Sequence, residues 1–255
     1  MEYFLAEFNL FISAFVDVLF YSISGWTYNP KMLFFGIYLI KPHRIFIYAR
    51  GGTDDLYHAL PNREGDVYNF ILSNLKLGDI FVDVGANVGY YSILAPKLVG
   101  TNGKVFAIEP IPQTSQVLKF NIKLNKLENV IVIDEAGWHT YAKLKLKIPM
   151  GEFGLASSFR NGELEVDVDA IPLNEVLAHT GLSQIKLIKI DVEGAEYEVL
   201  RGLTETLKHT KFVVLELSRK ADACLKMLQA YGFECRKMKF TDYYVCAKIK
   251  NSKSI

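Results

Sequence analysis

From residue 79 onward, short apolar segments alternate with segments of helical periodicity, and this alternation restricts the chain to few folds. The apolar runs are continuous, which is typical of strands covered on both faces. We expect strands at 80–84, 104–109, 130–134, 186–191 and 211–217, helices at 88–98, 112–126, 194–208 and 219–231, and final strands at 234–240 and 243–249. This order predicts an α/β fold, a doubly wound Rossmann-like sheet that ends in an antiparallel hairpin.

One insert interrupts the alternation between the third and fourth expected strands. Residues 143–148 and 163–169 alternate strictly between polar and apolar side chains and flank a loop of small residues. This predicts a hairpin that stands off the main sheet. We therefore expect one domain over 49–250, with the hairpin insert at about 143–169 and a frayed tail at 251–255.

The first 48 residues form an apolar extension. Residues 3–26 have apolar side chains at helical spacing, and 32–40 resemble a buried strand that could pair with 44–49. Lys31 is the first basic residue, so a secretory signal is not expected, and acidic and amide side chains make 3–26 a poor spanning helix. Packing on the protein's own core, homodimer contact and peripheral membrane attachment all stay open.

Charge and cysteine content limit which partners the protein can have and in which cellular compartment it is expected. The chain has 29 basic and 28 acidic residues, which is not the charge pattern of a duplex-binding protein, so no nucleic acid partner is expected. Cys224, Cys235 and Cys246 form no C-x-x-C pair. Cys235 and Cys246 could face each other across the terminal hairpin. We favour free thiols and a cytoplasmic protein, with membrane association through the N-terminal helix left open.

The segment FVDVGANVGYYSILA, residues 81–95, places an acid and two glycines where the first strand turns into its helix. Gly85 and Gly89 would let a ligand approach the backbone at the carboxyl end of the sheet. The dinucleotide fingerprint is G-x-G-x-x-G, whereas this segment is G-x-x-x-G preceded by Asp83. A carboxylate there would repel a pyrophosphate and attract an ammonium or a sulfonium. Glu109, which ends the second strand, could accept hydrogen bonds from both ribose hydroxyls, so the set favours S-adenosyl-L-methionine over NAD.

Four further residues complete the expected cofactor site. Ala86 and Asn87 belong to the glycine turn, and Asn87 either binds the methionine end of the cofactor or holds the turn. Glu135 and Ala136 close the third strand. The carboxylate of Glu135 could accept a hydrogen bond from the adenine amino group, or it could be a solvated loop acid.

Four segments together resemble the FkbM family of S-adenosylmethionine-dependent methyltransferases, namely FVDVGANVGYYSI, VFAIEP, IKIDVEGAEYEVLRG and RGGTDDL. The similarity covers about residues 48–248, and its most specific part is Asp-Val-Glu-Gly after the fourth strand. The resemblance implies a class I methyltransferase fold and methyl transfer to a hydroxyl oxygen of a small molecule, sugar, glycan or lipid-linked acceptor. It also implies roles that it carries over residue by residue: Asp83, Gly85, Asn87 and Gly89 in the cofactor loop, Glu109 at the ribose, and Asp191 and Glu193 as active-site acids.

The acids after the fourth and fifth strands are the expected catalytic residues. A hydroxyl is a poor nucleophile, so a base or a metal must help to remove its proton. We expect Asp191 or Glu193 to be that base or to orient the hydroxyl, with Glu216 as a third acid nearby. The three acids could instead hold one divalent cation, because oxygen ligands suit magnesium. Asp191 could also cap the following helix.

His139 follows the third strand and could act as a base, although a lone histidine is more often structural. Arg50, Thr53 and Asp55 match the family's N-terminal motif and either close over the cofactor or brace the sheet.

Two other classes of function stay open. An RNA-modifying methyltransferase would usually carry an N-P-P-[FY] turn where this chain has IDVEGA. A non-catalytic S-adenosylmethionine-binding scaffold would not need Asp191 and Glu193.

Overall fold

The computed structural model describes residues 35–40, 43–59, 64–178 and 184–249. Its centre is a seven-stranded sheet in the order β11-β12-β10-β9-β3-β4-β5. The strands are β3 (Ile80–Val84), β4 (Lys104–Ile108), β5 (Val130–Ile133), β9 (Ile185–Ile190), β10 (Thr210–Glu216), β11 (Phe233–Lys237) and β12 (Tyr243–Lys248). Strands β3, β4, β5, β9 and β10 are parallel, while β12 runs antiparallel to both β10 and β11. The predicted Rossmann-like sheet with a terminal antiparallel hairpin is therefore confirmed.

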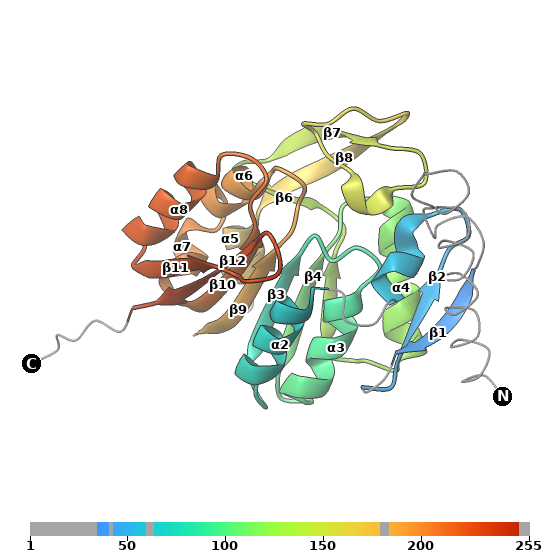
Figure 1. The fold of residues 1–255 in the computed structure, drawn as a ribbon, viewed down its shortest axis with the longest axis horizontal. Helices are drawn as coiled ribbons and strands as arrows, with labels where there is room; N and C mark the ends of the chain where they lie inside the picture. The colour runs from blue at the N-terminus through green and yellow to red at the C-terminus, as the bar shows by residue number, and fades with distance from the viewer. Residues whose placement is uncertain (1–34, 41–42, 60–63, 179–183, 250–255) are drawn as a thin grey trace, which may run out of the picture.

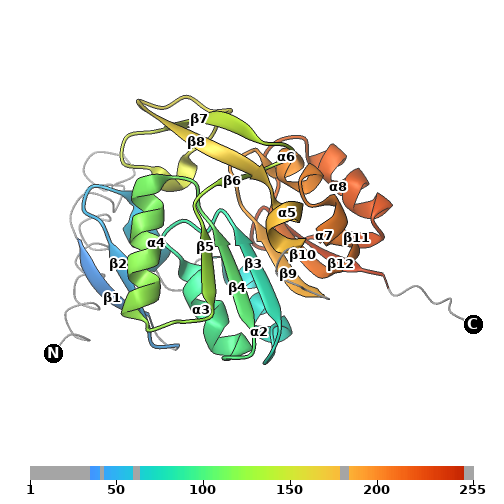
Figure 2. The ribbon, with the colours of Figure 1, turned by 180° about the vertical axis from the view of Figure 1, so that it is seen from behind.

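Helices cover both faces of this sheet, as Figures 1 and 2 show from opposite sides. One core cluster joins the sheet to α2 (Gly65–Asn74) and α3 (Tyr90–Val99). The other joins it to α5 (Leu173–Ala178), α6 (Glu196–Arg201), α7 (Thr204–Lys208) and α8 (Ala221–Ala230). Helix α4 (Pro112–Leu124) packs beside α3 and β5. Burial on both faces explains why the parallel strands are continuously apolar.

The insert forms a separate three-stranded sheet in the order β6-β8-β7. Strands β7 (Ala142–Ile148) and β8 (Leu164–Pro172) pair antiparallel as expected, and β6 (Ala136–Trp138) pairs parallel with β8. Both views place this sheet beyond one end of the central strands (Figures 1 and 2). A short helix, η3 (Phe153–Leu155), lies in the loop between β7 and β8.

The structure differs from the sequence prediction in several elements. The single helix expected at 194–208 is two helices, because the chain breaks at Gly202, where a Cβ would overlap the carbonyl oxygen of Trp138. Helix α2, helix α5 and strand β6 were not anticipated. Cys235 and Cys246 lie directly opposite each other on β11 and β12 and form a disulfide, so the expectation of free thiols was wrong for this pair. Cys224 is free and buried.

The described part of the N-terminal extension is a hairpin of β1 (Gly36–Ile40) and β2 (Ile45–Ala49), as the sequence predicted. Side chains of α4 and of its C-cap residue, Asn125, hold its backbone. Asn121 accepts from the amide of Tyr48 at 2.7 Å and donates to its carbonyl at 3.3 Å, and Asn125 makes the same pair of bonds to Phe46. The helix predicted at 3–26 lies outside the described residues. Within the described ranges, none of the helices has the length and apolarity that crossing a bilayer requires.

Replacing Asn121 by alanine should detach β2 from α4. The Asn121 side chain is fully buried and also donates to the carbonyl of Val88 at 2.9 Å. Its removal therefore leaves backbone groups of Tyr48 and Val88 without a hydrogen-bond partner. We expect Asn121→Ala to lower the free energy of unfolding in urea by about 2 to 3 kcal/mol. Gln116→Ala, an exposed position on the same helix, should change it by less than about 0.5 kcal/mol. Equal effects of the two substitutions would contradict this role.

Candidate active site

A cavity of about 310 Å³ opens where the parallel strands end. It is lined by the turn after β3, the ends of β4, β9 and β10, the insert, and η2 (Asp54–Ala59). Strand β3 continues through a helix to β4 on one side, while β9 lies on its other side. In open α/β sheets, the crevice at such a reversal of strand order is where ligands bind.

The turn after β3 brings most of the expected cofactor loop to the cavity. Asp83, Gly85, Ala86 and Asn87 all line it. The amides of Gly85 and Ala86 both donate to the carbonyl of Ile108 at 3.0 Å, which ties the turn to β4. Gly85 has φ +81°, and a Cβ there would overlap the backbone carbonyl of Asp191. Gly85 is therefore required for the contact between this turn and the end of β9, and not only for ligand approach.

Gly89 does not line the cavity. It stands immediately before α3 with φ +100°, and a Cβ would lie 2.5 Å from Leu118 Cδ1 and 3.3 Å from Ile93 Cδ1. The expected approach of a ligand to the Gly89 backbone stays a prediction without support from this placement. Its missing side chain allows α3 and α4 to pack closely.

Asp83 is buried beside the cavity. Its Oδ2 accepts from the Ser92 hydroxyl at 2.7 Å, and the Lys189 ammonium lies 4.0 Å from its Oδ1. Burial raises the pKa of Asp83 to about 6, against the opposing effects of Lys189 and Ser92. Within the described part of the chain, Oδ1 has no hydrogen-bond partner. The site thus contains a buried acceptor that a ligand's donor could satisfy.

Glu109 also lines the cavity, and backbone amides fix its orientation. Its Oε2 accepts from Asn87 N at 2.9 Å, and its Oε1 accepts from Ile111 N at 3.0 Å. Burial raises its pKa to about 7, although the two amides act in the opposite direction. Each oxygen retains a second lone pair, so the carboxylate is compatible with the expected contacts to ribose hydroxyls.

Of the two residues expected at the adenine, only one lines the cavity. Ala136, the first residue of β6, lines the cavity, but Glu135 does not. Successive residues of an extended chain point to opposite sides, which explains why neighbours differ here. The contact between Glu135 and adenine stays a prediction without support from this placement.

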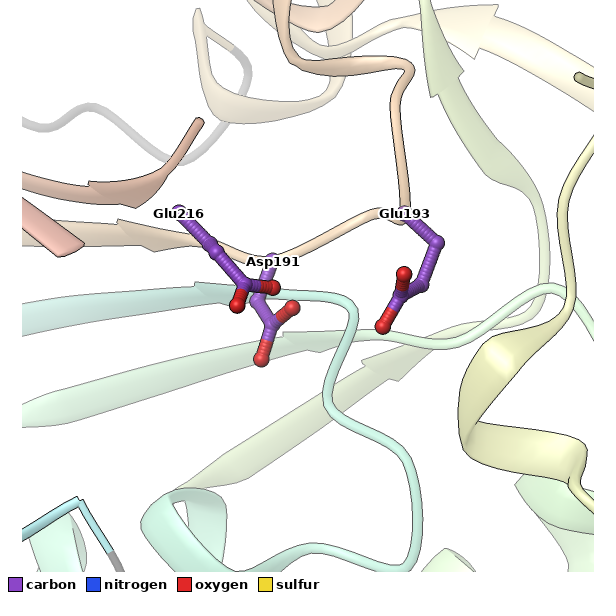
Figure 3. A group of neighbouring side chains, drawn as sticks. All are labelled: Asp191, Glu193 and Glu216. Carbon is purple, nitrogen blue, oxygen red and sulfur yellow. The ribbon is translucent and has the colours of Figure 1, made fainter. Parts of the chain in front are cut away.

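Asp191, Glu193 and Glu216 all line the same cavity, and Figure 3 shows their side chains as neighbours. One carboxylate oxygen of each lies within 4.8 Å of the others. Asp191 Oδ2 accepts from Lys189 Nζ at 3.0 Å and from the Tyr243 hydroxyl at 2.6 Å. Asp191 is not a helix cap, because α6 begins after Ala195 and has no side-chain cap. Among the described residues, these three acids are the one group that could hold a metal ion.

The acids have unequal proton affinities. Burial, the charge of Asp191 and a hydrogen bond with Asp191 raise the pKa of Glu216 to about 8. Burial and the charge of Asp191 raise the pKa of Glu193 to about 7, while Arg160 acts in the opposite direction. Arg160 Nη1 lies 2.8 Å from Glu193 Oε2. Glu193 also has φ +53°, an uncommon backbone state for a residue other than glycine.

Lys189 and Tyr243 are site residues that sequence reasoning missed. Lys189 is 3% exposed, and its ammonium lies 5.3 Å and 5.8 Å from the ring centroids of Tyr91 and Tyr243. Burial alone would lower its pKa, but the charges of Asp191, Asp83 and Glu64 outweigh that effect, and its pKa is raised. The available signal was a lysine inside the otherwise apolar strand IKLIKI. Tyr243 comes from the terminal hairpin and gave no signal.

The N-terminal motif braces the site from outside. Both oxygens of Asp55 accept from the Arg50 guanidinium at 2.8 Å, and Arg50 also donates to Thr114 of α4 at 3.3 Å. Arg50, Thr53 and Asp55 do not line the cavity, and neither does His139. Of the two roles left open for the motif, bracing is the one that the contacts show.

A family model described as the methyltransferase FkbM domain matches residues 83–235. The chain belongs to the FkbM methyltransferase family. The fold and the resemblance proposed from the sequence are thereby confirmed, and the chain is an S-adenosylmethionine-dependent methyltransferase.

Several curated proteins are similar to this FkbM-family chain. Hexuronic acid methyltransferase AglP of Haloferax volcanii is 27% identical over 167 residues, which cover 62% of this chain and 64% of AglP. Methyltransferase sdnD of Sordaria araneosa is 30% identical, covering 63% of this chain and 69% of that protein. The 31-O-demethyl-FK506 methyltransferase FkbM of Streptomyces tacrolimicus is 27% identical, covering 62% and 74%. The match to AglP spans slightly less than two thirds of that relative.

Solved structures show more distant likeness. Fibrillarin of Aeropyrum pernix, in complex with S-adenosyl-L-methionine, is 13% identical with a TM-score of 0.45 and covers 69% of this chain and 68% of its own. An rRNA methylase of Streptococcus thermophilus is 14% identical with a TM-score of 0.47 and covers 75% and 100%. These likenesses are too weak to bear on substrate or mechanism.

Replacing Gly85 by alanine should damage the fold itself. The added Cβ overlaps the Asp191 carbonyl and the backbone has φ +81°, so we expect a loss of at least about 2 kcal/mol in free energy of unfolding. Gly52→Ala is the matched control, because Gly52 has φ +71° but open space around it, and should cost about 1 kcal/mol. Urea denaturation compares the two. An equal cost would show that the carbonyl contact is unimportant.

The raised pKa of Glu216 predicts how the stability of the protein depends on pH. Between its ordinary pKa of 4.5 and its folded-state value of about 8, the folded protein binds more protons than the unfolded chain. Stability from this group is therefore lost as pH rises through that window. Glu216→Gln should become more stable relative to the parent protein from about pH 5 to about pH 9, by on the order of 1 kcal/mol or more. A difference in unfolding free energy that does not change with pH would contradict the assignment.

Proposed function

We propose that this methyltransferase transfers the methyl group of S-adenosyl-L-methionine to a hydroxyl oxygen of a small molecule, sugar, glycan or lipid-linked acceptor. The observation that carries the proposal is that three carboxyls line the same cavity as the cofactor loop, and that one of them, Glu193, has a pKa of about 7. A group with a pKa near neutrality is suited to remove a proton at neutral pH. The names of AglP and of the FK506 methyltransferase, which specify a hexuronic acid and an O-demethylated compound, are consistent with oxygen as the acceptor atom.

The residues of the cavity fit the cofactor. Within the described residues, Asp83 Oδ1 is buried and has no hydrogen-bond partner, so it can accept from a donor of the cofactor, and Gly85, Ala86 and Asn87 line the cavity beside it. Glu109 keeps acceptor capacity for ribose hydroxyls, and Ala136 lines the cavity at the edge of the insert sheet. S-adenosylmethionine supplies an electrophilic methyl group on a sulfonium. The protein's task is then to align the acceptor oxygen and to take its proton.

Among the three acids, we assign proton removal to Glu193. Asp191 Oδ2 already accepts from Lys189 and from Tyr243, so we assign Asp191 an anchoring role rather than that of the base. Glu216, with a pKa of about 8, is mostly protonated at neutral pH and suits a hydrogen-bond donor. Glu193 lines the cavity, and its pKa of about 7 suits proton removal at neutral pH. Asp191 and Glu216 then position the base and the acceptor.

The same three acids have the chemistry to hold a divalent cation. In this protein, however, two cationic side chains already contact them, Lys189 at Asp191 and Arg160 at Glu193. A metal ion would compete with both. We therefore propose proton removal without a metal, for which full activity in excess EDTA is the test.

The acceptor class can be tested with methyl-labelled S-adenosylmethionine. The protein is incubated with sugars, polyols and lipid-linked glycans, and the labelled product is located by mass spectrometry and NMR. Label on an acceptor oxygen supports the proposal. Label on nucleobases of added RNA would favour an RNA-modifying enzyme instead, and binding of the cofactor without any transfer would favour a scaffold.

Removing the proposed base should affect chemistry more than cofactor binding. We expect Glu193→Gln to slow turnover by on the order of a hundredfold or more, because general base catalysis contributes at least that much. The affinity for S-adenosylhomocysteine, measured by calorimetry, should change little. Glu128→Gln, at an exposed position on another segment, should leave both unchanged. Undiminished turnover in Glu193→Gln would remove Glu193 from the chemistry.

A further inference from the structure

Part of the cavity wall comes from a segment that precedes the matched family domain. The domain match begins at residue 83, but Asp54 and Tyr57 of η2 line the cavity. Helix η2 packs against η3 of the insert, about a hundred residues later in the chain. The two short helices together form a clasp at one side of the cavity, outside the central sheet.

Asp54 holds this clasp together. Its amide donates to the carbonyl of Gly151 at 2.8 Å, and its Oδ2 accepts from the amide of Gly154 at 2.8 Å. A Cβ on Gly154 would lie 2.7 Å from Asp54 Oδ2 and 2.9 Å from Asn87 Nδ2. The carboxylate of Asp54 therefore lies close to Asn87 in the cofactor loop, with Gly154 between them.

The other oxygen of Asp54 is available to a ligand. Within the described residues, Asp54 Oδ1 is buried and has no hydrogen-bond partner. Its neighbour Asp55 differs, because both of its oxygens are taken by Arg50. Burial also raises the pKa of Asp54 to about 6, with the amide of Gly154 acting in the opposite direction. A buried acceptor without a partner is an exception in proteins and calls for a donor.

We propose that Asp54 Oδ1 accepts a hydrogen bond from an O–H or N–H group of S-adenosylmethionine, which makes the segment 50–59 part of the cofactor site. This inference rests on the proposed function. The cofactor is favoured over the methyl acceptor because Asp54 adjoins Asn87 of the cofactor loop, whereas the three catalytic acids lie at the ends of β9 and β10. Asp54 is a binding residue in this proposal and takes no part in proton transfer.

The test is the affinity for S-adenosylhomocysteine, measured by calorimetry without any acceptor. Asp54→Asn can keep the bond from Gly154 but presents an N–H to the ligand's donor. We expect its dissociation constant to rise at least about tenfold, which is about 1.4 kcal/mol. Asp79→Asn makes the same chemical change before β3, at the opposite end of the strand, and should not alter the affinity. Equal affinity of Asp54→Asn and the parent protein would overturn the proposal.

Two ligand analogues identify the bonded group. One lacks the ribose 2′-hydroxyl and the other lacks the amino group of the amino acid moiety. The penalty of Asp54→Asn should disappear for the analogue that lacks the group bound by Asp54. If the penalty persists undiminished with both, analogues without the ribose 3′-hydroxyl and without the adenine amino group are tested in the same way, and a penalty undiminished with all four would overturn the proposal.

A measurement on the unaltered protein covers the case in which Asp54→Asn does not fold. Hydrogen exchange should show that S-adenosylhomocysteine protects the amides of Asp54 and Gly154, because the ligand stabilises the clasp. Unchanged exchange at both amides, together with clear protection in the turn after β3, would overturn this inference alone. No binding of S-adenosylhomocysteine by the parent protein would overturn the proposed function as well.

Discussion

A single buried ammonium group, that of Lys189, makes the rest of the site possible. Lys189 lies opposite Asp83 in the β3–β9 pairing, and its side chain contacts Asp191 at the end of its own strand. Two carboxylates and two aromatic rings surround it, and its pKa is raised. Without that charge, the carboxyls of Asp83 and Asp191 would lie near each other with no cation between them, an arrangement of high free energy when both are ionised. One cation thus links the cofactor loop to the catalytic acids.

The parallel topology determines where the acids meet, and local contacts determine what each can do. Parallel strands end at the same edge of the sheet, so the residues that follow β3, β9 and β10 meet there. A lysine and a tyrosine donate hydrogen bonds to Asp191, burial and the charge of Asp191 raise the pKa of Glu216 to about 8, and burial and the charge of Asp191 raise the pKa of Glu193 to about 7. Three chemically similar side chains thereby acquire different states, which is how an enzyme obtains an anchor, a donor and a base from carboxyls.

The sequence expectations that the structure contradicts or does not support share one cause. Gly89 and Glu135 were expected at the ligand because of their positions in a motif or after a strand, but the structure turns Gly89 toward α4 and leaves Glu135 off the cavity. Cys235 and Cys246 were expected as free thiols, but the hairpin register puts them side by side. In each case the outcome depends on which neighbour the chain packs against, and periodicity carries no information about that neighbour.

The sequence by itself determined the alternation of strands and helices, the parallel sheet, the glycine turn after Asp83 and the family. These features follow from local periodicity and from residue types that a strand-to-turn-to-helix transition requires. The tertiary structure decided that Lys189 and Tyr243 hold Asp191, that Gly85 makes room for a carbonyl, and that Asp54 reaches the cavity from before the matched domain. Lys189 and Asp191 are only two residues apart, but the contacts of Tyr243, Gly85 and Asp54 join segments between about fifty and a hundred residues apart, and only folding brings those atoms together.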